Sequence, residues 1–332
     1  MSEFAFSGLG FNPHFGTPKN PWDRSAGRIP GGSSSGAAIS VTDGMACAAL
    51  GTDTGGSCRI PAALTGIVGW KPTARRISLD GVLPLSPSLD SVGTLAASVD
   101  DCAIVDAILA DEEIEPAPKS RPLRGVRFAV PETLALDDID DHVSRAFDLA
   151  IQRLSRSGAI IEHVTLPELA EIQVINAKGG LPAAEAYAWH RPLIRDKAEL
   201  YDPRVLTRIK RGAEQDAADY ITLCRMRADW ILRVTARLEP FDALLMPTVP
   251  NLAPLLSEIE EDEDFTRLNL RMLRNSTIIN MLDGCAISLP CSEPNEAPVG
   301  LTIAGLALSD STVFAIARSV EVAVNGQAVQ DH

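Results

Sequence analysis

The chain lacks the sequence features of a membrane protein or a secreted protein. Its longest apolar runs are interrupted by Gly, Asp or Pro, and residues 1–10 contain no basic residue with which a signal peptide could begin. No C-x-x-C pair occurs among the six cysteines, which favours reduced thiols over a disulfide framework. Positively charged residues are fewer than negatively charged ones: the chain has 30 Lys and Arg and 44 Asp and Glu, and its net charge is −14. We therefore expect a cytoplasmic protein that does not itself bind a membrane or nucleic acid.

Histidine is scarce and is not arranged as a metal site requires. None of the five histidines forms an i, i+4 pair or lies beside a cysteine pair, so we expect no metal. His163 falls within an apparent strand, and we predict that it packs in the sheet. His14 and His190 are the two histidines that we consider as neighbours of a substrate, although packing is the simpler interpretation of both.

What the sequence does contain is a pair of glycine-flanked serines. Ser33 lies in GGSSSG over residues 31–36, and Ser57 closes GTDTGGS over residues 51–57. Glycine has no Cβ, so a substrate can approach the backbone N–H groups closely. A hydroxyl beside a run of N–H donors is what acyl transfer needs, because the reaction requires a nucleophile and a pocket for the oxyanion. The pattern predicts a serine nucleophile.

Two other interpretations of these serines are open. A GSSSG stretch taken alone is usually a flexible loop, but a second glycine-serine motif with flanking Asp-Thr and Arg-Ile-Pro disfavours that interpretation. Residues 32–36 also read as G-x-S-x-G, the nucleophile elbow, which requires a strand immediately before it. Residues 25–30 are SAGRIP and do not form a strand pattern, which disfavours the elbow.

The serine motifs belong to a longer series in fixed order. It comprises NPWD (20–23), GGSSSG (31–36), GTDTGGS with RIPA (51–57, 59–62) and GIVGWKPT (66–73), with weaker matches at LPLSPSLD (83–90), DALLMPT (242–248), AISLP (286–290) and PVGL (298–301). This series resembles the amidase signature family of serine amide hydrolases, and the resemblance extends over nearly the whole chain. It implies a single amidase domain over residues 1–326 with a tail at 327–332.

The resemblance implies a role for each residue of the two loops. Ser57 matches the nucleophile, and Ser33 matches the serine that follows a cis peptide bond and relays the proton. Asp53 and Arg59 flank the nucleophile, where we expect them to brace the loop. The backbone N–H groups implied to form the oxyanion hole are those of Thr54, Gly55, Gly56 and Ser57.

The third member of the family's triad is a lysine on a segment well upstream of the glycine-serine loop. Only 32 residues precede Ser33, so we expect this lysine to lie upstream of the chain, which would then be N-terminally truncated and inactive as given. Lys19 and Lys71 match family positions that are not the base, and we expect Lys71 to support packing.

Hydrophobic periodicity predicts an α/β protein with one mixed sheet covered by helices on both faces. The strand–helix–strand order over 126–164 predicts a parallel pair with a helical crossover. Predicted helices cover 99–110, 141–157, 168–195, 203–211, 214–238, 265–282 and 310–324, and predicted strands cover 126–130, 159–164, 243–247, 286–290 and 299–304. The section from about 168 to 240 is expected to line the substrate funnel, with Trp189, His190, Arg191, Tyr201 and Arg204 as candidate contacts.

Together these observations predict an amidase that hydrolyses a carboxylic amide through an acyl-enzyme at Ser57. The substrate would be a small amide, and a serine nucleophile with an oxyanion hole needs no cofactor. One alternative is the amidase subunit of a glutamyl/aspartyl-tRNA amidotransferase, although residues 283–285 (DGC) depart from the Gly-Leu-Pro expected there. A catalytically dead, amidase-like binding protein is a second alternative, and a homodimer is possible in either case.

Overall fold

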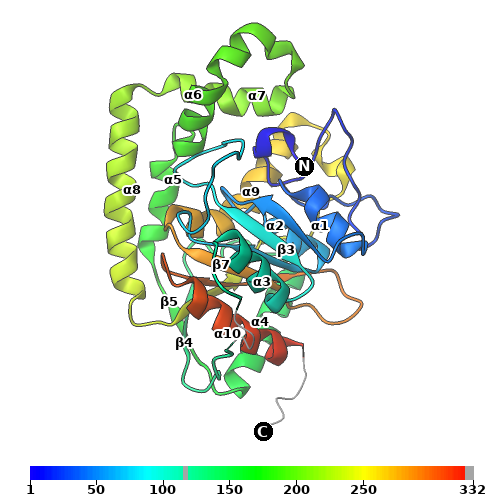
Figure 1. Ribbon diagram of the computed structural model, residues 1–332, viewed down its shortest axis with the longest axis vertical. Coiled ribbons are helices and arrows are strands. Elements are labelled where there is room, and N and C mark those ends of the chain that lie inside the picture. Colours follow the sequence, from blue (N-terminus) through cyan, green and yellow to red (C-terminus); the bar gives the residue numbers. More distant parts are fainter. Residues whose placement is uncertain (115–118, 326–332) are drawn as a thin grey trace.

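The computed structural model describes residues 1–114 and 119–325, and its centre is one eight-stranded sheet (Figure 1). The strand order is β1-β3-β2-β7-β8-β6-β4-β5. β4 is parallel to β5 and β6, and the other pairs are antiparallel, so the sheet is mixed as predicted. The strands are β1 (Ala48–Thr52), β2 (Val68–Lys71), β3 (Val92–Ala96), β4 (Arg127–Pro131), β5 (Ile160–Val164), β6 (Ala243–Pro247), β7 (Cys285–Pro290) and β8 (Gly300–Gly305).

Helices cover both faces of this sheet because successive strand residues point to opposite sides. Phe128 and Val130 pack in one core with α4 and α10, whereas Ala129 between them packs in the other core with α8 and α9. The α-helices are α1 (Ser35–Thr42), α2 (Arg59–Thr65), α3 (Val99–Leu109), α4 (Asp141–Arg156), α5 (Glu171–Ile175), α6 (Gly180–Lys197), α7 (Pro203–Lys210), α8 (Ala217–Leu238), α9 (Asp262–Met281) and α10 (Asp310–Val324). No helix of the described residues is both long and apolar enough to cross a bilayer.

Local signals in the sequence set several of the observed boundaries. Ser98 accepts a hydrogen bond from the backbone N–H of Asp101 (3.1 Å) and so caps α3. Gly158 follows α4 with φ +89°, the left-handed conformation that ends helices. The predicted β4–α4–β5 unit is present, with Arg127 paired to Ile160 in a parallel register.

Two expectations were wrong. The predicted helix over 168–195 is divided into a 3₁₀ turn (Pro167–Ala170), α5 and α6. The chain cannot continue as one helix from α5 into α6 because Gly179, just before α6, has φ +96°, which an α-helix does not allow. His163 does not pack in the sheet: β5 is the edge strand, and the His163 side chain is 52% exposed. The tail predicted at 327–332 lies outside the described residues.

Helices α6 and α7 lie at the end of the molecule where the opening segment of the chain runs, and α8 lies along the outer edge (Figure 1). They contain most of the section that was expected to line a substrate funnel. Phe6 of the opening segment packs with Ala186 of α6 and Val205 of α7 in one small core. The helices of this section are therefore held against the N-terminal segment that reaches the serine loops.

Candidate active site

Ser57 lies in the short loop that joins β1 to α2, and its side chain is almost completely buried. The loop is held by the Asp53–Arg59 ion pair, with Arg59 Nη2 2.9 Å from Asp53 Oδ1 and both side chains fully buried. The Asp53 carboxylate also accepts the backbone N–H groups of Gly56 (2.9 Å) and Cys58 (3.2 Å). This is the geometry that a brace requires, because one carboxylate joins the residues on both sides of Ser57.

Electrostatics keep this brace ionised. Burial by itself would raise the pKa of Asp53, but the charge and hydrogen bonds of Arg59 outweigh it and lower the pKa to about 2. Breaking a buried pair by removing one partner typically costs about 3–5 kcal/mol, because the other charge stays buried without compensation. The loop around Ser57 is consequently rigid.

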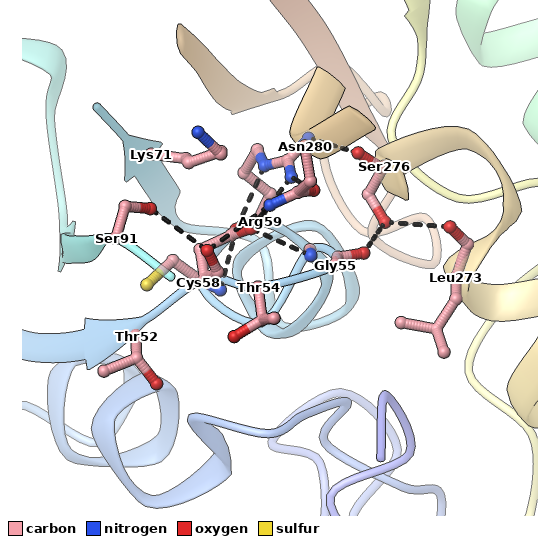
Figure 2. A network of polar contacts seen from close by, with 12 residues as sticks. Thr52, Thr54, Gly55, Cys58, Arg59, Lys71, Ser91, Leu273, Ser276 and Asn280 are labelled. Atoms are coloured by element: carbon pink, nitrogen blue, oxygen red, sulfur yellow. Dashed lines mark hydrogen bonds and ion pairs between the residues drawn. The ribbon is translucent and has the colours of Figure 1, made fainter. Parts of the chain in front are cut away.

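Helix α9 supports the loop from the other side, and sequence reasoning missed this contribution (Figure 2). Asn280 accepts a hydrogen bond from Arg59 (2.7 Å) and donates one to Asp53 (2.9 Å). Ser276 Oγ donates to the carbonyl of Gly55 (2.6 Å). The available signal was Asn280, which stands among apolar residues at 278–282 (IINML), where a polar side chain needs a buried partner.

Gly56 permits the close contact between the loop and α9. Its φ is +129°, and a Cβ atom at this position would lie 2.1 Å from Ser276 Oγ. A side chain at residue 56 would therefore displace α9 or the loop.

The four backbone N–H groups proposed for an oxyanion hole are not equivalent. The Gly56 N–H donates to Asp53 and is engaged. Among the described residues, the N–H groups of Thr54, Gly55 and Ser57 have no hydrogen-bond acceptor. Of the four expected donors, three therefore have no acceptor within the part of the chain that the structure describes.

The Ser33 loop lies against the Ser57 loop. The backbone N–H of Ser34 donates to the Ser57 carbonyl (3.2 Å), and the Gly32–Ser33 peptide bond is cis, as the resemblance implied. Ser33 Oγ is buried without a hydrogen-bond partner among the described residues. The two hydroxyls, of Ser33 and Ser57, are not hydrogen-bonded to each other here. Catalytic hydrogen bonds are often long in the absence of substrate.

The opening segment of the chain, residues 1–10, holds the Ser33 loop through backbone hydrogen bonds. Ser2 N–H donates to the Ser33 carbonyl (3.1 Å), and Gly32 N–H donates to the Gly8 carbonyl (2.8 Å). A Cβ at Gly32 would lie 2.4 Å from the backbone nitrogen of Gly10, so glycine is required for this approach. The described residues contain no cluster of His, Cys, Asp and Glu that could hold a metal ion.

Comparison with known proteins identifies the family to which the chain belongs. A family model described as Amidase matches residues 1–314. The chain belongs to the amidase family. This assignment confirms the resemblance seen in the sequence.

Relatives of this amidase-family chain differ in what they are named for. It is 38% identical to the "2-amino-5-chloromuconic acid deaminase" of Comamonas testosteroni, over 97% of this chain and 70% of that protein. It is 32% identical to a glutamyl-tRNA(Gln) amidotransferase subunit of Thermotoga maritima, over 97% of this chain and 73% of that one. A crystal structure of an amidase is 33% identical and superposes with a TM-score of 0.85 over 97% of this chain and 73% of that one, which confirms the α/β fold.

Neither lysine near the motifs of this amidase-family chain is placed as a base. Lys71 is buried and donates to the carbonyls of Pro72 and Gly284, both at 2.8 Å. Burial lowers the pKa of Lys71 to about 8, against the opposing attraction of Asp53. Lys19 is exposed. His14 lies 3.2 Å from Glu3, so its neighbour is a carboxylate and not a serine.

The candidate contacts of the middle section have different environments. His190 is fully buried, with Nδ1 2.8 Å from Tyr201 Oη, and burial lowers its pKa to about 4. Trp189 is 40% exposed and packs edge-on against His190. Arg191 is exposed. Arg204 pairs with Asp262 (2.6 Å), so its charge is already compensated.

Arg208, which the sequence did not single out, differs from Arg204 in having no ion pair within the described part of the chain. It hydrogen-bonds the Phe6 carbonyl (2.5 Å) and stacks over the Phe6 ring, and it pairs with no carboxylate among the described residues. Burial lowers the pKa of Arg208 to about 10. It contacts the same opening segment that holds the Ser33 loop.

Proposed function

We propose that this chain hydrolyses the C–N bond of a carboxylic amide with Ser57 as the nucleophile. The observation that carries the proposal is one braced loop that contains Ser57 and three N–H groups, those of Thr54, Gly55 and Ser57, with no acceptor among residues 1–114 and 119–325. Such donors stabilise the oxyanion that forms when a hydroxyl attacks a carbonyl, and removing one typically costs about 10²- to 10³-fold in rate. The family membership supports the same reaction class.

In the proposed mechanism Ser57 Oγ attacks the carbonyl carbon while its proton passes to Ser33, which passes its own proton to a base. Collapse of the tetrahedral intermediate breaks the C–N bond, and the departing nitrogen is protonated through Ser33 as ammonia or an amine leaves. Water then attacks the acyl-enzyme by the same route and frees Ser57. The buried Ser33 hydroxyl, with no competing partner among the described residues, suits this relay.

The proposed base is the family's lysine, supplied from outside the 332 residues. Lys71 is unsuitable as the base because its ammonium group already donates to two carbonyls and its side chain is buried. Lys19 is exposed to solvent. This gives the complete Ser–cis-Ser–Lys arrangement that the resemblance implies.

We further propose that the substrate carries a carboxylate. The relative at 38% identity is named for the deamination of 2-amino-5-chloromuconic acid, which is an acid. Arg208 offers a desolvated guanidinium without a carboxylate partner, and arginine binds carboxylates through two parallel hydrogen bonds. A small amide that also carries a carboxylate is the substrate class that combines both features.

The amidase subunit of a tRNA amidotransferase is the second candidate, because relatives at 32% and 33% identity carry that name. We favour the stand-alone hydrolase, since residues 283–285 depart from the pattern expected of that subunit. Partner-subunit genes beside this one, and ammonia release from glutamine only in their presence, would reverse the preference.

A fluorophosphonate probe tests the nucleophile directly. We expect slow labelling of the 332-residue chain confined to the Ser57 peptide by mass spectrometry, because an oxyanion hole alone retains about 10³- to 10⁴-fold of catalysis. Ser57→Ala should abolish the labelling and Ser33→Ala should slow it.

Ser40→Ala is the matched control, since the Ser40 hydroxyl only bonds the Ala37 carbonyl within α1. Labelling that survives Ser57→Ala would overturn the assignment. A folded chain that takes up no label at Ser57 would instead support the catalytically inactive, amidase-like binding protein.

A further inference from the structure

The loop that holds Ser57 is connected to the middle-section helices by a chain of buried and half-buried carboxylates and hydroxyls. Thr54 Oγ1 donates to Asp90 Oδ1 at 2.5 Å. The second oxygen, Asp90 Oδ2, accepts the backbone N–H groups of Leu85 (2.9 Å) and Ser86 (3.0 Å). Asp90 is 3% exposed, so these contacts are shielded from water.

The residue after Asp90 holds Asp53, the residue next to Thr54 in the same loop. The Asp53 backbone N–H donates to the Ser91 carbonyl (2.8 Å), and Ser91 Oγ donates to the Asp53 carbonyl (3.0 Å). Residues 90 and 91 therefore contact residues 53 and 54 through three hydrogen bonds. The position of Thr54, a proposed oxyanion donor, follows that of the 84–91 segment.

The 84–91 segment is in turn held by α6. Glu185 accepts hydrogen bonds from Ser86 Oγ (2.7 Å) and from the Ser88 N–H (3.1 Å) and hydroxyl. Tyr220 of α8 donates to Glu185 Oε1 (2.9 Å), the oxygen that also accepts the Ser88 hydroxyl. Glu185 thus joins α6, α8 and the 84–91 segment at one point.

We propose that Asp90 is a positioning residue for the oxyanion hole, acting through Thr54, and that Glu185 transmits the position of α6 and α8 to it. The inference rests on the proposed function for the role of Thr54 as an oxyanion donor. The hydrogen-bonded connection from Thr54 to Glu185 does not depend on that function. Substrate contacts made by the middle-section helices would in this way set the geometry of the N–H donors beside Ser57. Displacements of about 1 Å at a catalytic group are worth up to about 10²-fold in rate.

Asp90→Asn separates this role from simple packing. The side chain keeps its size but becomes neutral, and one of its two acceptor oxygens becomes an NH₂ group. If the NH₂ faces Thr54, the hydroxyl has to accept instead of donate and the short bond to a carboxylate becomes a weaker neutral one; if it faces the backbone, the Leu85 and Ser86 N–H groups lose their acceptor. We expect the rate constant of fluorophosphonate labelling at Ser57 to fall at least about tenfold. We also expect faster hydrogen–deuterium exchange in the peptide covering residues 52–58.

A double-mutant cycle tests whether Asp90 acts through Thr54. Thr54→Val should lower the labelling rate as Asp90→Asn does, Thr54→Ser, which keeps the hydroxyl, should lower it less than Thr54→Val, and the double variant should be no slower than the slower single variant. Glu185→Gln should produce a smaller loss that disappears in the Asp90→Asn background. Fully additive losses would overturn the proposal.

Asp106→Asn is the matched control, because Asp106 is an equally buried carboxyl that bonds Trp70 (2.7 Å) and Arg76 (2.7 Å) instead. It should lower thermal stability without changing exchange over residues 52–58 or the labelling rate. If wild-type Ser57 takes up no label, the proposed function fails, and the exchange measurement alone decides the connection. Unchanged hydrogen–deuterium exchange over residues 52–58 in Asp90→Asn would then refute the connection between Asp90 and the Ser57 loop.

Discussion

At the scale of single residues, the site depends on charges that are buried yet compensated. Asp53 and Arg59 neutralise each other beside Ser57, and Lys71 is the third charge in the same region. Lys71 has no carboxylate within ion-pair distance among the described residues and uses carbonyl oxygens instead. Its ammonium form is therefore the least favoured of the three charged states.

The lowered pKa of Lys71 predicts a specific pH dependence of stability. Between pH 8 and 10.5 the folded chain has released the Lys71 proton while the unfolded chain still binds it. The free energy of unfolding should thus gain a contribution that rises with pH, by at most about 1.4 kcal/mol per pH unit. Denaturant unfolding at pH 7.5 and 10 should show this rise in the wild type relative to Lys71→Met. An identical pH dependence in both proteins would contradict the prediction.

At the scale of elements, α9 is the support on which the nucleophile loop rests. Three of its polar residues, Asn275, Ser276 and Asn280, are buried and face backbone or charged partners. Their spacing keeps Ser276 and Asn280 on one face of the helix, one turn apart. The helix therefore contributes hydrogen bonds as well as apolar packing.

Asn280→Ala should destabilise the chain by about 1.5–3 kcal/mol, because it removes hydrogen bonds to both members of a buried ion pair. Leu270→Ala on the same helix is the control, since Leu270 is 61% exposed and its truncation should change stability by less than about 0.5 kcal/mol. Thermal or denaturant unfolding measures both. Equal effects of the two substitutions would show that α9 supports the loop by packing alone.

At the scale of the whole molecule, the proposed mechanism divides the site between this chain and a base outside it. Without that lysine, loss of one member of a concerted unit typically removes about 10⁴-fold or more of the rate. We therefore expect ammonia release from small amides by the 332-residue chain to stay near background. Robust turnover that Ser57→Ala abolishes would place the base within these residues, and Lys71, Lys19 and His14 would be the first to substitute.

The sequence by itself determined the family, the mixed α/β sheet and the two serine loops. These follow from local information: apolar periodicity fixes strands and helices, and glycines beside a serine mark backbone that must approach a neighbour closely. Ser98 and Gly158 likewise set helix ends through contacts within one turn. The break between α5 and α6 also has a local signal, the consecutive glycines Gly179 and Gly180. The apolar pattern continues across them, and the prediction therefore joined the two helices.

Only the tertiary structure decided which groups meet at the site. Asn280 is 227 residues from Asp53, and Glu185 is 97 residues from Ser88, so no local pattern relates them. The engagement of the Gly56 N–H by Asp53, and the lack of a carboxylate beside Arg208 among the described residues, depend on how distant segments pack. Hydrogen bonds act over about 3 Å, and that proximity is set by the fold and not by the order of residues along the chain.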